Sequence, residues 1–525
     1  MKHWNIKYKT AVLLVLFAMG VSTSCISDLD VEPIDPSVTQ TFEQDGVFAK
    51  IYATLALTGQ EGPAGRGDVD GIDEGTSAFV RLIWNLNELT TDEAICSWGD
   101  PGIPEMNFNR WSSSHDQITG VYGRFYFNVT LCNHFLEQTE GMTDEKTMKQ
   151  RAETRFLRAL NYFYLMDFFG SVPFTEVVAT EAPKQISRAD LFDYVEKELT
   201  ECEADMYDPK QAPYYRADKA ANWLLKSRLY LNAEVYTGTP KWNEAATYAK
   251  KVMDSAYKLN PDYTHLFMGD NSGSNINKAP QEIILPIAAD GIKTRSWGSS
   301  LFLIASTRTS GMPNWGSTEG WGGNRARATL VKKFFPDGNI PANAYVTPTT
   351  TGAADKRALF FVDPNDRTLE IQKVEIFKQG YSVMKYNNAR ADGASPSDTQ
   401  FPDMDVPFLR AAEAYLTFAE ATLRAGGSND EALTAINALR TRANAPIFTT
   451  INLDRILDEK AREFYFEGHR RTDLIRYGYY GSGDYNWDWK GGSPSGTKFS
   501  EIYNLFPIPS TDMNSNENLV QNPGY

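Results

Sequence analysis

The run of residues 408–478 constrains the fold more than any other part of the sequence. Its first segment carries an apolar stripe at helical spacing, formed by Ala412, Leu416, Ala419 and Leu423. Gly426 ends this pattern, because glycine takes the left-handed cap conformation without a steric penalty. Ser428 and Glu431 then form a capping box for a second helix. Two helices joined by so short a turn are expected to pack antiparallel.

A third helix pattern follows over 456–468 and is dense in charge. The charged residues at and beyond its end are Arg462, Glu463, Glu467, Arg470, Arg471, Asp473 and Arg476. Acids and bases three or four residues apart support a helix through ion pairs. We therefore predict a solvated, ion-paired helix junction here, in preference to a catalytic cluster.

Similar helix pairs occupy 144–206 and 221–252, whereas glycine, proline, serine and asparagine are frequent in 260–407. The pairs resemble tetratricopeptide units, whose period is ~34 residues. The sequence predicts a mainly α fold, an irregular tetratricopeptide-like helix-pair scaffold with a loop-rich insertion that carries short strands. We expect one unit over 41–525, with its scaffold in 41–57, 116–259 and 408–478, its loop-rich part in 58–115 and 260–407, and an extended C-terminal segment in 479–525.

Residues 1–24 have the pattern of a signal peptide. Three lysines precede a short apolar run, and small residues lead to Cys25. We predict a lipobox, with the lipid on Cys25 and a polar tether over 25–40; ordinary cleavage beside an unrelated cysteine is the alternative. No other stretch of the sequence is apolar enough to span a membrane. Three further cysteines remain, an odd number that does not suggest a disulfide framework.

Composition and motifs narrow the possible chemistry. The formal net charge of -15 argues against nucleic acid or an anionic membrane surface as a partner. The sequence contains no phosphate loop, dinucleotide fingerprint, nucleophile elbow or zinc-protease motif. Paired carboxylates for glycoside hydrolysis stay open as an alternative, because such a pair forms in space rather than in sequence.

Four tryptophans lie in loops, and a glycine follows each of them: Trp98, Trp297, Trp315 and Trp321. A small neighbour leaves a ring face open, and a pyranose can lay its apolar C–H face on such a ring. Arginine and carboxylate side chains suit the hydroxyl groups of a sugar. The alternative is that each ring packs its own loop onto the scaffold.

The C-terminal part resembles the signature of the SusD/RagB family in the segments LRAAEAYLTFAEA, INALRTRANAP, EKAREFYFEGHRRTDLIRYG and LFPIPSTDMNSNENLVQNPGY. Members of this family are surface glycan-binding lipoproteins of Bacteroidetes. The resemblance implies a protein without enzymatic activity at the outer-membrane surface, held there by its lipid anchor alone. It also implies a SusC-like TonB-dependent outer-membrane transporter as the partner.

The segments DGIDEGTSAFVR, QEIILPIAADGIKTRSWG and YNWDWKGG extend the resemblance to starch-binding members of the family over nearly the whole chain. It implies that an aromatic arc cradles an α-1,4-glucan and that polar groups bind its hydroxyls, at Trp98, Trp297, Trp321, Asp73 and Arg81. Those members have an asparagine shortly after the first tryptophan, where this chain has a shorter loop containing Asp100. The implied function is binding of starch oligosaccharides and their delivery to the transporter. A different glycan, or a glycosidase, is the alternative.

Three acids form the one metal hypothesis, namely Asp270, Asp403 and Asp405. Carboxylate oxygens on rigid loops suit calcium, and the same resemblance implies a structural calcium at these positions. The alternative, which their spacing favours, is that they are ordinary loop and helix-cap acids.

Overall fold

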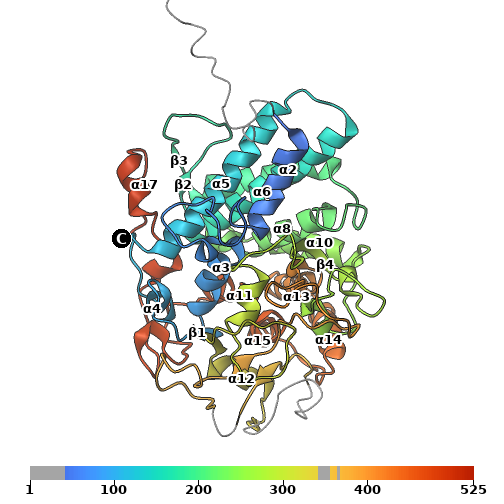
Figure 1. Ribbon diagram of the computed structural model, residues 1–525, viewed down its shortest axis with the longest axis vertical. Helices are drawn as coiled ribbons and strands as arrows, with labels where there is room; N and C mark the ends of the chain where they lie inside the picture. Colours follow the sequence, from blue (N-terminus) through green and yellow to red (C-terminus); the bar gives the residue numbers. More distant parts are fainter. Residues whose placement is uncertain (1–41, 341–354, 364–366) are drawn as a thin grey trace, which may run out of the picture. The chain divides into compact units, whose positions relative to one another are not determined.

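The computed structural model describes residues 42–340, 355–363 and 367–525. Contacts divide the chain into residues 1–47 and a unit Phe48–Tyr525, and the architecture below is that of the second unit. Among the described residues it is mostly helical, with four small two-stranded sheets (Figure 1). This confirms the mainly α fold class.

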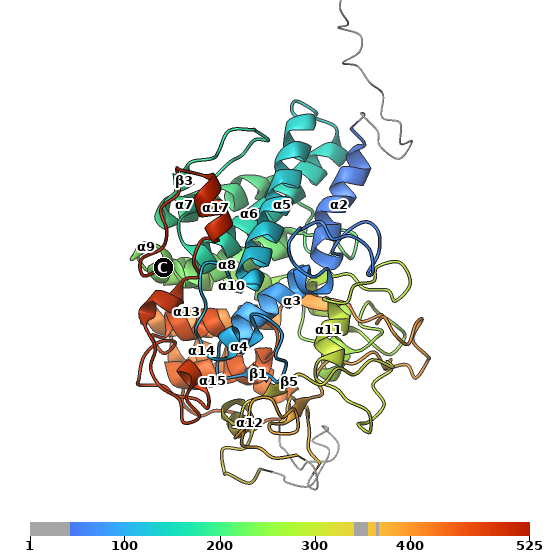
Figure 2. The ribbon, with the colours of Figure 1, turned by 60° about the vertical axis from the view of Figure 1, so that its left-hand side comes forward.

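The first helix pairs follow one another along the chain. α5 (Asp116–Gln138) packs on α6 (Glu145–Phe169), and α6 packs on α7 (Arg188–Cys202), as Figure 2 shows. Polar caps start two of these helices, because a cap oxygen satisfies a free N–H of the first turn. Asp144 accepts a hydrogen bond from Thr147 N at 3.0 Å at the start of α6. The apolar stripes of α5 and α6 are buried, as the helical spacing predicts.

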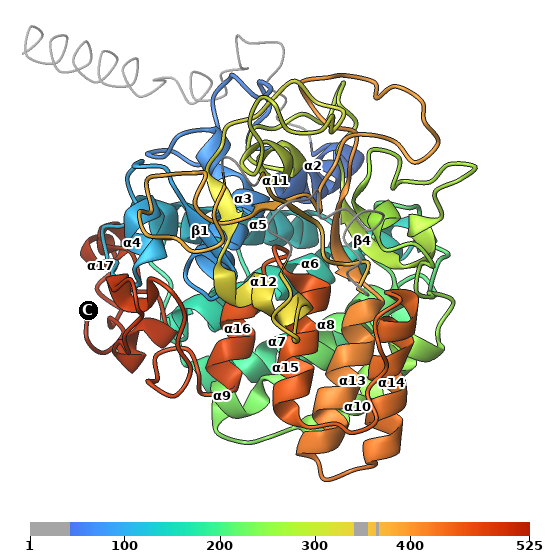
Figure 3. The ribbon, with the colours of Figure 1, turned by 90° about the horizontal axis from the view of Figure 1, so that it is seen from below.

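The second group of helices carries the C-terminal scaffold. α8 (Lys219–Leu231) packs on α10 (Trp242–Asp254), which packs on α13 (Ala412–Arg424), and α13 packs on α14 (Asn429–Arg442) and α15 (Leu453–Phe464) (Figure 3). The core shared by α13, α14 and α15 includes Leu416, Ile436, Leu439, Ile456 and Phe464. The oxygen of the Ser428 side chain accepts a hydrogen bond from Glu431 N at 3.3 Å, so half of the predicted capping box is present.

The start of the C-terminal scaffold was predicted wrongly. Phe408 was expected to open a helix, but it lies in strand β8 (Val406–Arg410), and α13 begins at Ala412. β8 pairs antiparallel with β4 (Ile283–Ile287). The two strands are distant in sequence. The local pattern around Phe408 therefore gave no sign that pairing with β4 would make this segment a strand.

Shorter elements complete the unit. The helices are α2 (Gln44–Ala56), α3 (Phe79–Trp84), α4 (Ile103–Asn107), α9 (Ala233–Thr237), α11 (Ser300–Ala305), α12 (Ala328–Phe334), α16 (Arg470–Arg476) and α17 (Ser510–Ser515). The remaining strand pairs are β1 (Ala94–Cys96) with β5 (Asn324–Ala326), β2 (Val172–Pro173) with β3 (Gln185–Ile186), and β6 (Phe360–Phe361) with β7 (Ser382–Val383). Strands β1, β5, β6 and β7 lie in the parts predicted to be loop-rich, whereas β2 and β3 lie within the predicted helical scaffold.

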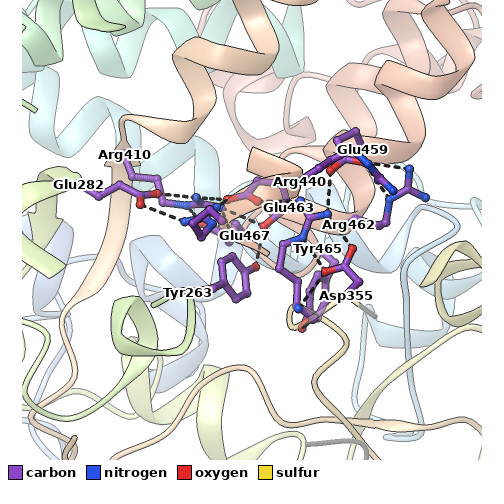
Figure 4. A network of polar contacts seen from close by, with 12 residues as sticks. Tyr263, Glu282, Asp355, Arg410, Arg440, Glu459, Arg462, Glu463, Tyr465 and Glu467 are labelled. Carbon is purple, nitrogen blue, oxygen red and sulfur yellow. Dashed lines mark hydrogen bonds and ion pairs between the residues drawn. The ribbon is translucent and has the colours of Figure 1, made fainter. Parts of the chain in front are cut away.

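The charged junction around α15 and α16 is ion-paired but buried, which corrects the prediction that it is solvated (Figure 4). Glu463 pairs with Arg357 Nη1 at 3.0 Å, with Arg410 Nη1 at 2.6 Å and with Arg442. Burial alone would raise the pKa of Glu463, but the charges of these three arginines hold it well below its usual range. The arginines come from segments far from Glu463, so ion pairs join parts of the fold that are distant in sequence.

Candidate functional site

Trp98 follows strand β1, and the pairing of β1 with β5 fixes its position. Cys96 lies opposite Asn324, and Ser97 N donates to Gly323 O at 3.0 Å. This pairing brings Trp98 beside Trp321, with 6.5 Å between ring centroids and 49° between ring planes. Residue 323 must be glycine here, because a Cβ atom would lie 2.3 Å from the Trp98 ring.

Trp297 comes from a third segment, just before α11. At the end of α11, Ala305 O accepts a hydrogen bond from Trp321 N at 2.8 Å, which ties the two tryptophan segments together. The ring centroids of Trp297 and Trp321 lie 6.3 Å apart, with 46° between ring planes. Three segments that are far apart in sequence thus bring their tryptophans to one place. The successive tilts make the aromatic surface curved rather than flat.

The three rings line an open hollow of about 390 Å³ together with Arg81 and Asp100. We call this the tryptophan hollow. All three rings are half-buried, so each keeps part of its surface open to solvent. Arg81 lies on α3, which contacts α11 (Figures 1 and 2), and its guanidinium carbon is 5.6 Å from the centroid of Trp98. Aromatic faces, a cation and a carboxylate therefore meet in one place.

Arg81 is held by its surroundings and is electrostatically linked to both predicted acids. Its main-chain N donates to Gly298 O at 3.1 Å. Burial lowers the pKa of its guanidinium, and the charges of Asp73 and Asp100 oppose that shift. Asp73 does not line the hollow itself. Its Oδ1 accepts hydrogen bonds from N and Oγ1 of Thr76, both at 3.0 Å, so it shapes a turn beside the site.

Trp315 does not join the tryptophan hollow. Its side chain is buried, and its Nε1 donates to Glu319 O at 3.1 Å. The packing alternative considered for each loop tryptophan therefore describes Trp315.

Two residues that shape the hollow were missed from sequence. Glu319 Oε2 accepts a hydrogen bond from Trp321 Nε1 at 2.9 Å, and its Oε1 accepts one from Gln400 Nε2 at 3.1 Å. The buried ring of Phe401 lies 4.9 Å from that of Trp297. Glu319 could have been found from the sequence, because a carboxylate two residues before a loop tryptophan can accept a hydrogen bond from its indole. Phe401 left no signal, because it is distant in sequence from the ring that it supports.

The chemistry of the tryptophan hollow suits binding. Within the described residues, Asp100 is the one carboxylate that lines it, whereas glycoside hydrolysis generally uses two carboxyl groups that flank the scissile bond. Aromatic faces with a few fixed polar groups are typical of sites that orient a ligand.

The three predicted metal ligands do not form a carboxylate cluster. In the part of the chain that the structure describes, no group of three or more His, Cys, Asp or Glu side chains could hold a metal. Both carboxylate oxygens of Asp270 accept hydrogen bonds, from Ala391 N and Ser274 Oγ among others, each of these two at 2.9 Å. Asp403 Oδ2 accepts one from Ser397 N at 2.8 Å. These acids are therefore already satisfied by the protein.

Asp405 differs from the other two acids. Its Oδ1 accepts a hydrogen bond from Ala289 N at 2.9 Å, while its Oδ2 is buried without a hydrogen-bond partner among the described residues. Burial raises the pKa of Asp405 to about 8; Ala289 N and the nearby Tyr215 hydroxyl oppose that shift, while the charges of Asp290 and Asp403 add to it. One unsatisfied carboxylate oxygen near two like charges is compatible with a cation, so calcium stays an untested prediction.

The predicted anchor cannot be placed. Cys25 lies outside the described residues, as do the predicted signal peptide and tether. Of the described helices, none is long and apolar enough to cross a membrane. Cys96, Cys132 and Cys202 are buried and free.

Known proteins resemble this chain along most of its length. Two family models match the chain, one for the SusD family over residues 368–525 and one described as starch-binding, associating with outer membrane, over residues 29–231. The starch-binding protein SusD of Bacteroides thetaiotaomicron is 46% identical in sequence, and the alignment covers 98% of both chains.

Solved structures share the fold at much lower identity. A SusD-like protein from Bacteroides fragilis matches with a TM-score of 0.68 at 19% identity, over 94% of this chain and 100% of that one. The surface glycan-binding protein A of Bacteroides thetaiotaomicron, solved with laminarihexaose, matches with a TM-score of 0.66 at 20% identity, over 91% of this chain and 98% of that one. Identity to SusD along nearly its whole length shows that this chain belongs to the SusD family.

Proposed function

We propose that this chain binds starch or α-1,4-glucan oligosaccharides at the tryptophan hollow without cleaving them. The observation that carries the proposal is the convergence of Trp98, Trp297 and Trp321, from three separate segments, around one hollow with Arg81. A relative 46% identical over 98% of the chain is named as a starch-binding protein. An α-1,4-linked glucan is itself curved, so its sugar faces can follow an arc of tilted rings.

The binding mechanism divides the work between stacking and hydrogen bonding. Each ring covers the C–H face of one glucose unit, and aromatic contacts of this kind contribute about 0.5–1.5 kcal/mol beyond the buried area. Arg81 donates hydrogen bonds to hydroxyl oxygens, and Asp100 accepts them from hydroxyl groups. Glu319 acts indirectly, because its carboxylate fixes the indole of Trp321. Such a site gives moderate affinity and lets the oligosaccharide leave again.

Gel electrophoresis with amylopectin in the gel tests binding, and an assay for new reducing ends tests cleavage. We expect retarded migration and no new reducing ends. Release of shorter sugars would favour the glycosidase alternative. A panel of other polysaccharides tests the alternative that the ligand is a different glycan. Stronger retardation by a glycan without α-1,4 linkages would show that this glycan, and not starch, is the preferred ligand.

The same proposal places the protein at the outer-membrane surface, anchored by a lipid on Cys25, as the binding partner of a SusC-like TonB-dependent transporter. The family description, association with the outer membrane, supports the location, and the resemblance noted in the sequence supports the partner. Cys25→Ala is expected to release the protein from membranes or leave it unprocessed. Mild detergent extraction is expected to recover the transporter with the wild-type protein. Its consistent absence would contradict the import role.

A structural calcium beside Asp405 is also part of the proposal. Asp405 Oδ2 is buried without a hydrogen-bond partner in the described chain, and Asp290 and Asp403 bring like charge near it. A divalent cation would use that oxygen and offset the crowded negative charge. Its role would be to hold these loops rather than to touch the sugar.

A further inference from the structure

A second, larger hollow is lined mainly by the segments that lead into α8 and β4. It measures about 630 Å³ and shares no lining residue with the tryptophan hollow. Residues 210–216 form one part of its lining and residues 273–283 another, and Tyr257 also contributes. The proposed glucan site gives this hollow no role.

The exposed charges in this hollow are positive, although the protein carries a formal net charge of -15. Lys210 and Lys278, one from each of the two lining segments, are exposed. Lys278 Nζ donates to Ser274 O at 3.0 Å, and Lys210 Nζ lies 5.1 Å from the Tyr257 ring centroid. Among the described residues neither lysine has a carboxylate partner in an ion pair. We call this site the lysine hollow.

Several acids around the lysine hollow are occupied by other groups, among them Asp270, which accepts hydrogen bonds from the lining residues Ser274 and Asn277. Glu153 is buried and accepts two hydrogen bonds from Arg216, from Nε at 2.9 Å and from Nη2 at 2.5 Å. Asp218 is also buried, and its oxygens accept hydrogen bonds from Lys210 N at 2.8 Å, Tyr257 Oη at 2.8 Å and Ala220 N at 2.8 Å. Neither lysine ammonium group forms an ion pair with a carboxylate in the described chain, although the charge of Asp218 acts on Lys210 and opposes the lowering of its pKa by burial.

The backbone at Lys210 is held in an unusual conformation. Its φ of 66° lies in the left-handed region, which is uncommon for a residue with a side chain. The hydrogen bond from Lys210 N to the buried Asp218 holds that conformation. Strained positions of this kind persist when the surrounding structure fixes them, and they gather at binding sites.

Two exposed apolar side chains stand next to the lining residues. Tyr215 is 41% exposed and lies between the lining residues Tyr214 and Arg216 in sequence; its hydroxyl interacts with Asp405, and its ring is the apolar part. Ile276 is 57% exposed and precedes the lining residue Asn277. An isoleucine has neither a flat face for a sugar nor a hydrogen-bonding group for its hydroxyls. Apolar anchors beside unpaired cations fit a peptide surface better than a glycan.

We propose that the lysine hollow docks a segment of a partner protein that presents carboxylate side chains next to apolar ones. Charge complementarity selects an acidic segment, and Tyr215 and Ile276 supply the apolar contacts. The inference rests on the proposed function, in which that partner is the TonB-dependent transporter. Glucan binding at the tryptophan hollow is independent of this contact.

The test uses the full-length protein co-expressed with its transporter, and compares wild type with Lys210→Glu/Lys278→Glu. We expect recovery of the transporter in mild detergent to fall about tenfold or more, because two attractive contacts become repulsive. Retardation by amylopectin should stay unchanged, which also shows that the variant is folded. Lys278→Glu alone, at an exposed position, should give a smaller fall. The matched control is Lys197→Glu/Lys373→Glu, which reverses two exposed lysines elsewhere and should leave recovery unchanged.

The outcomes separate the inference from the function on which it rests. If the wild type recovers no transporter, the proposed partnership fails and this inference fails with it. If the wild type recovers the transporter and the lysine variant recovers as much, the docking site alone is wrong. Oligogalacturonate is the probe for an acidic saccharide. If it binds the wild type and not the lysine variant while transporter recovery is equal, the hollow takes an acidic glycan and the peptide assignment is overturned.

Discussion

The buried charged junction and the tryptophan hollow reverse the usual placement of residue types. At the junction, Glu463 and Arg357 are fully buried and satisfy each other. At the hollow, three large aromatic side chains stay half-exposed on loops. Charge is normally outside and aromatic surface inside, because isolated buried charges and exposed apolar patches are both unfavourable.

The difference separates structure from function. At the junction the buried carboxylates form ion pairs with arginines of the same protein. Few of its polar groups are therefore free to bind a ligand. The hollow leaves its rings only partly covered, so part of each ring stays open for contact with a ligand. The buried ion pairs join and orient the helices of the scaffold. The scaffold in turn holds the loops that carry the tryptophans, whose ring faces stay open to solvent.

The largest effect is expected where a buried charge loses its match. Glu463→Gln removes a buried carboxylate that three arginines share, and breaking a buried ion pair costs about 3–5 kcal/mol of unfolding free energy. Each arginine keeps another carboxylate, Glu459 for Arg357 and Glu282 for Arg410 and Arg442, so we expect a loss toward the lower end of that range. Urea unfolding measures the loss. The matched control is Glu370→Gln, whose ion pair with Lys332 is exposed and contributes little. A folded Glu463→Gln protein that has lost glucan binding at wild-type stability would break the separation between the two regions.

Acid should weaken the junction in a defined pH window. The charges of neighbouring arginines and lysines outweigh burial and lower the pKa of Glu459 and of Glu420 to about 2. Their folded pKa lies below the unfolded value of about 4.3, so their stabilisation is fully present above that value and is lost as pH falls toward 2. We expect the free energy of unfolding to fall over this range in urea titrations. The slope should shrink in Glu459→Gln, and an unchanged slope would contradict the assignment.

Removing calcium should have an intermediate effect on stability. We expect EGTA to lower the melting temperature by a few degrees, because an ion that binds only the folded state stabilises it, and added calcium to restore it. Asp405→Asn should make the melting temperature indifferent to both treatments. Identical melting curves of the wild type in EGTA and in calcium would remove the calcium proposal and leave the tryptophan hollow untouched.

The smallest predicted effect sharpens the description of the hollow itself. Glu319→Ala removes the acceptor that fixes the indole of Trp321, and a single hydrogen bond contributes roughly 1 kcal/mol. Affinity for maltoheptaose should therefore fall by about fivefold, with no change in melting temperature. Calorimetric titration measures both the affinity and the enthalpy. Wild-type affinity in this variant would show that Trp321 needs no such support.

Local patterns predicted the helices well, because each element depends on its own spacing. The scaffold part expected to begin at residue 116 does begin there, with α5, Asp116–Gln138, and the stripe beginning at Ala412 is α13. The errors occurred where distant partners decide. Phe408 became a strand through β4, and Glu463 became buried through arginines that lie elsewhere in the chain.

The candidate site divides in the same way. Glycine after each loop tryptophan, together with family resemblance, was enough to name Trp98, Trp297 and Trp321, which the structure brings together. The sequence could not tell Trp315 from them, because burial depends on the surrounding loops. The role of Phe401 could not be predicted from the sequence, because it contacts Trp297 only in the folded protein. The lysine hollow could not be predicted either, because its lining comes from segments that are separate in sequence.

The most direct test of the central claim is the maltoheptaose affinity of Trp98→Ala/Trp321→Ala, measured by calorimetric titration beside its melting temperature. Each ring is expected to contribute about tenfold in affinity, equal to ~1.4 kcal/mol, so each single variant should bind about tenfold more weakly. The double variant should show no binding and a melting temperature close to that of the wild type, since the helical scaffold is untouched. Wild-type affinity in the double variant would contradict the account, because the glucan would then bind somewhere other than the tryptophan hollow.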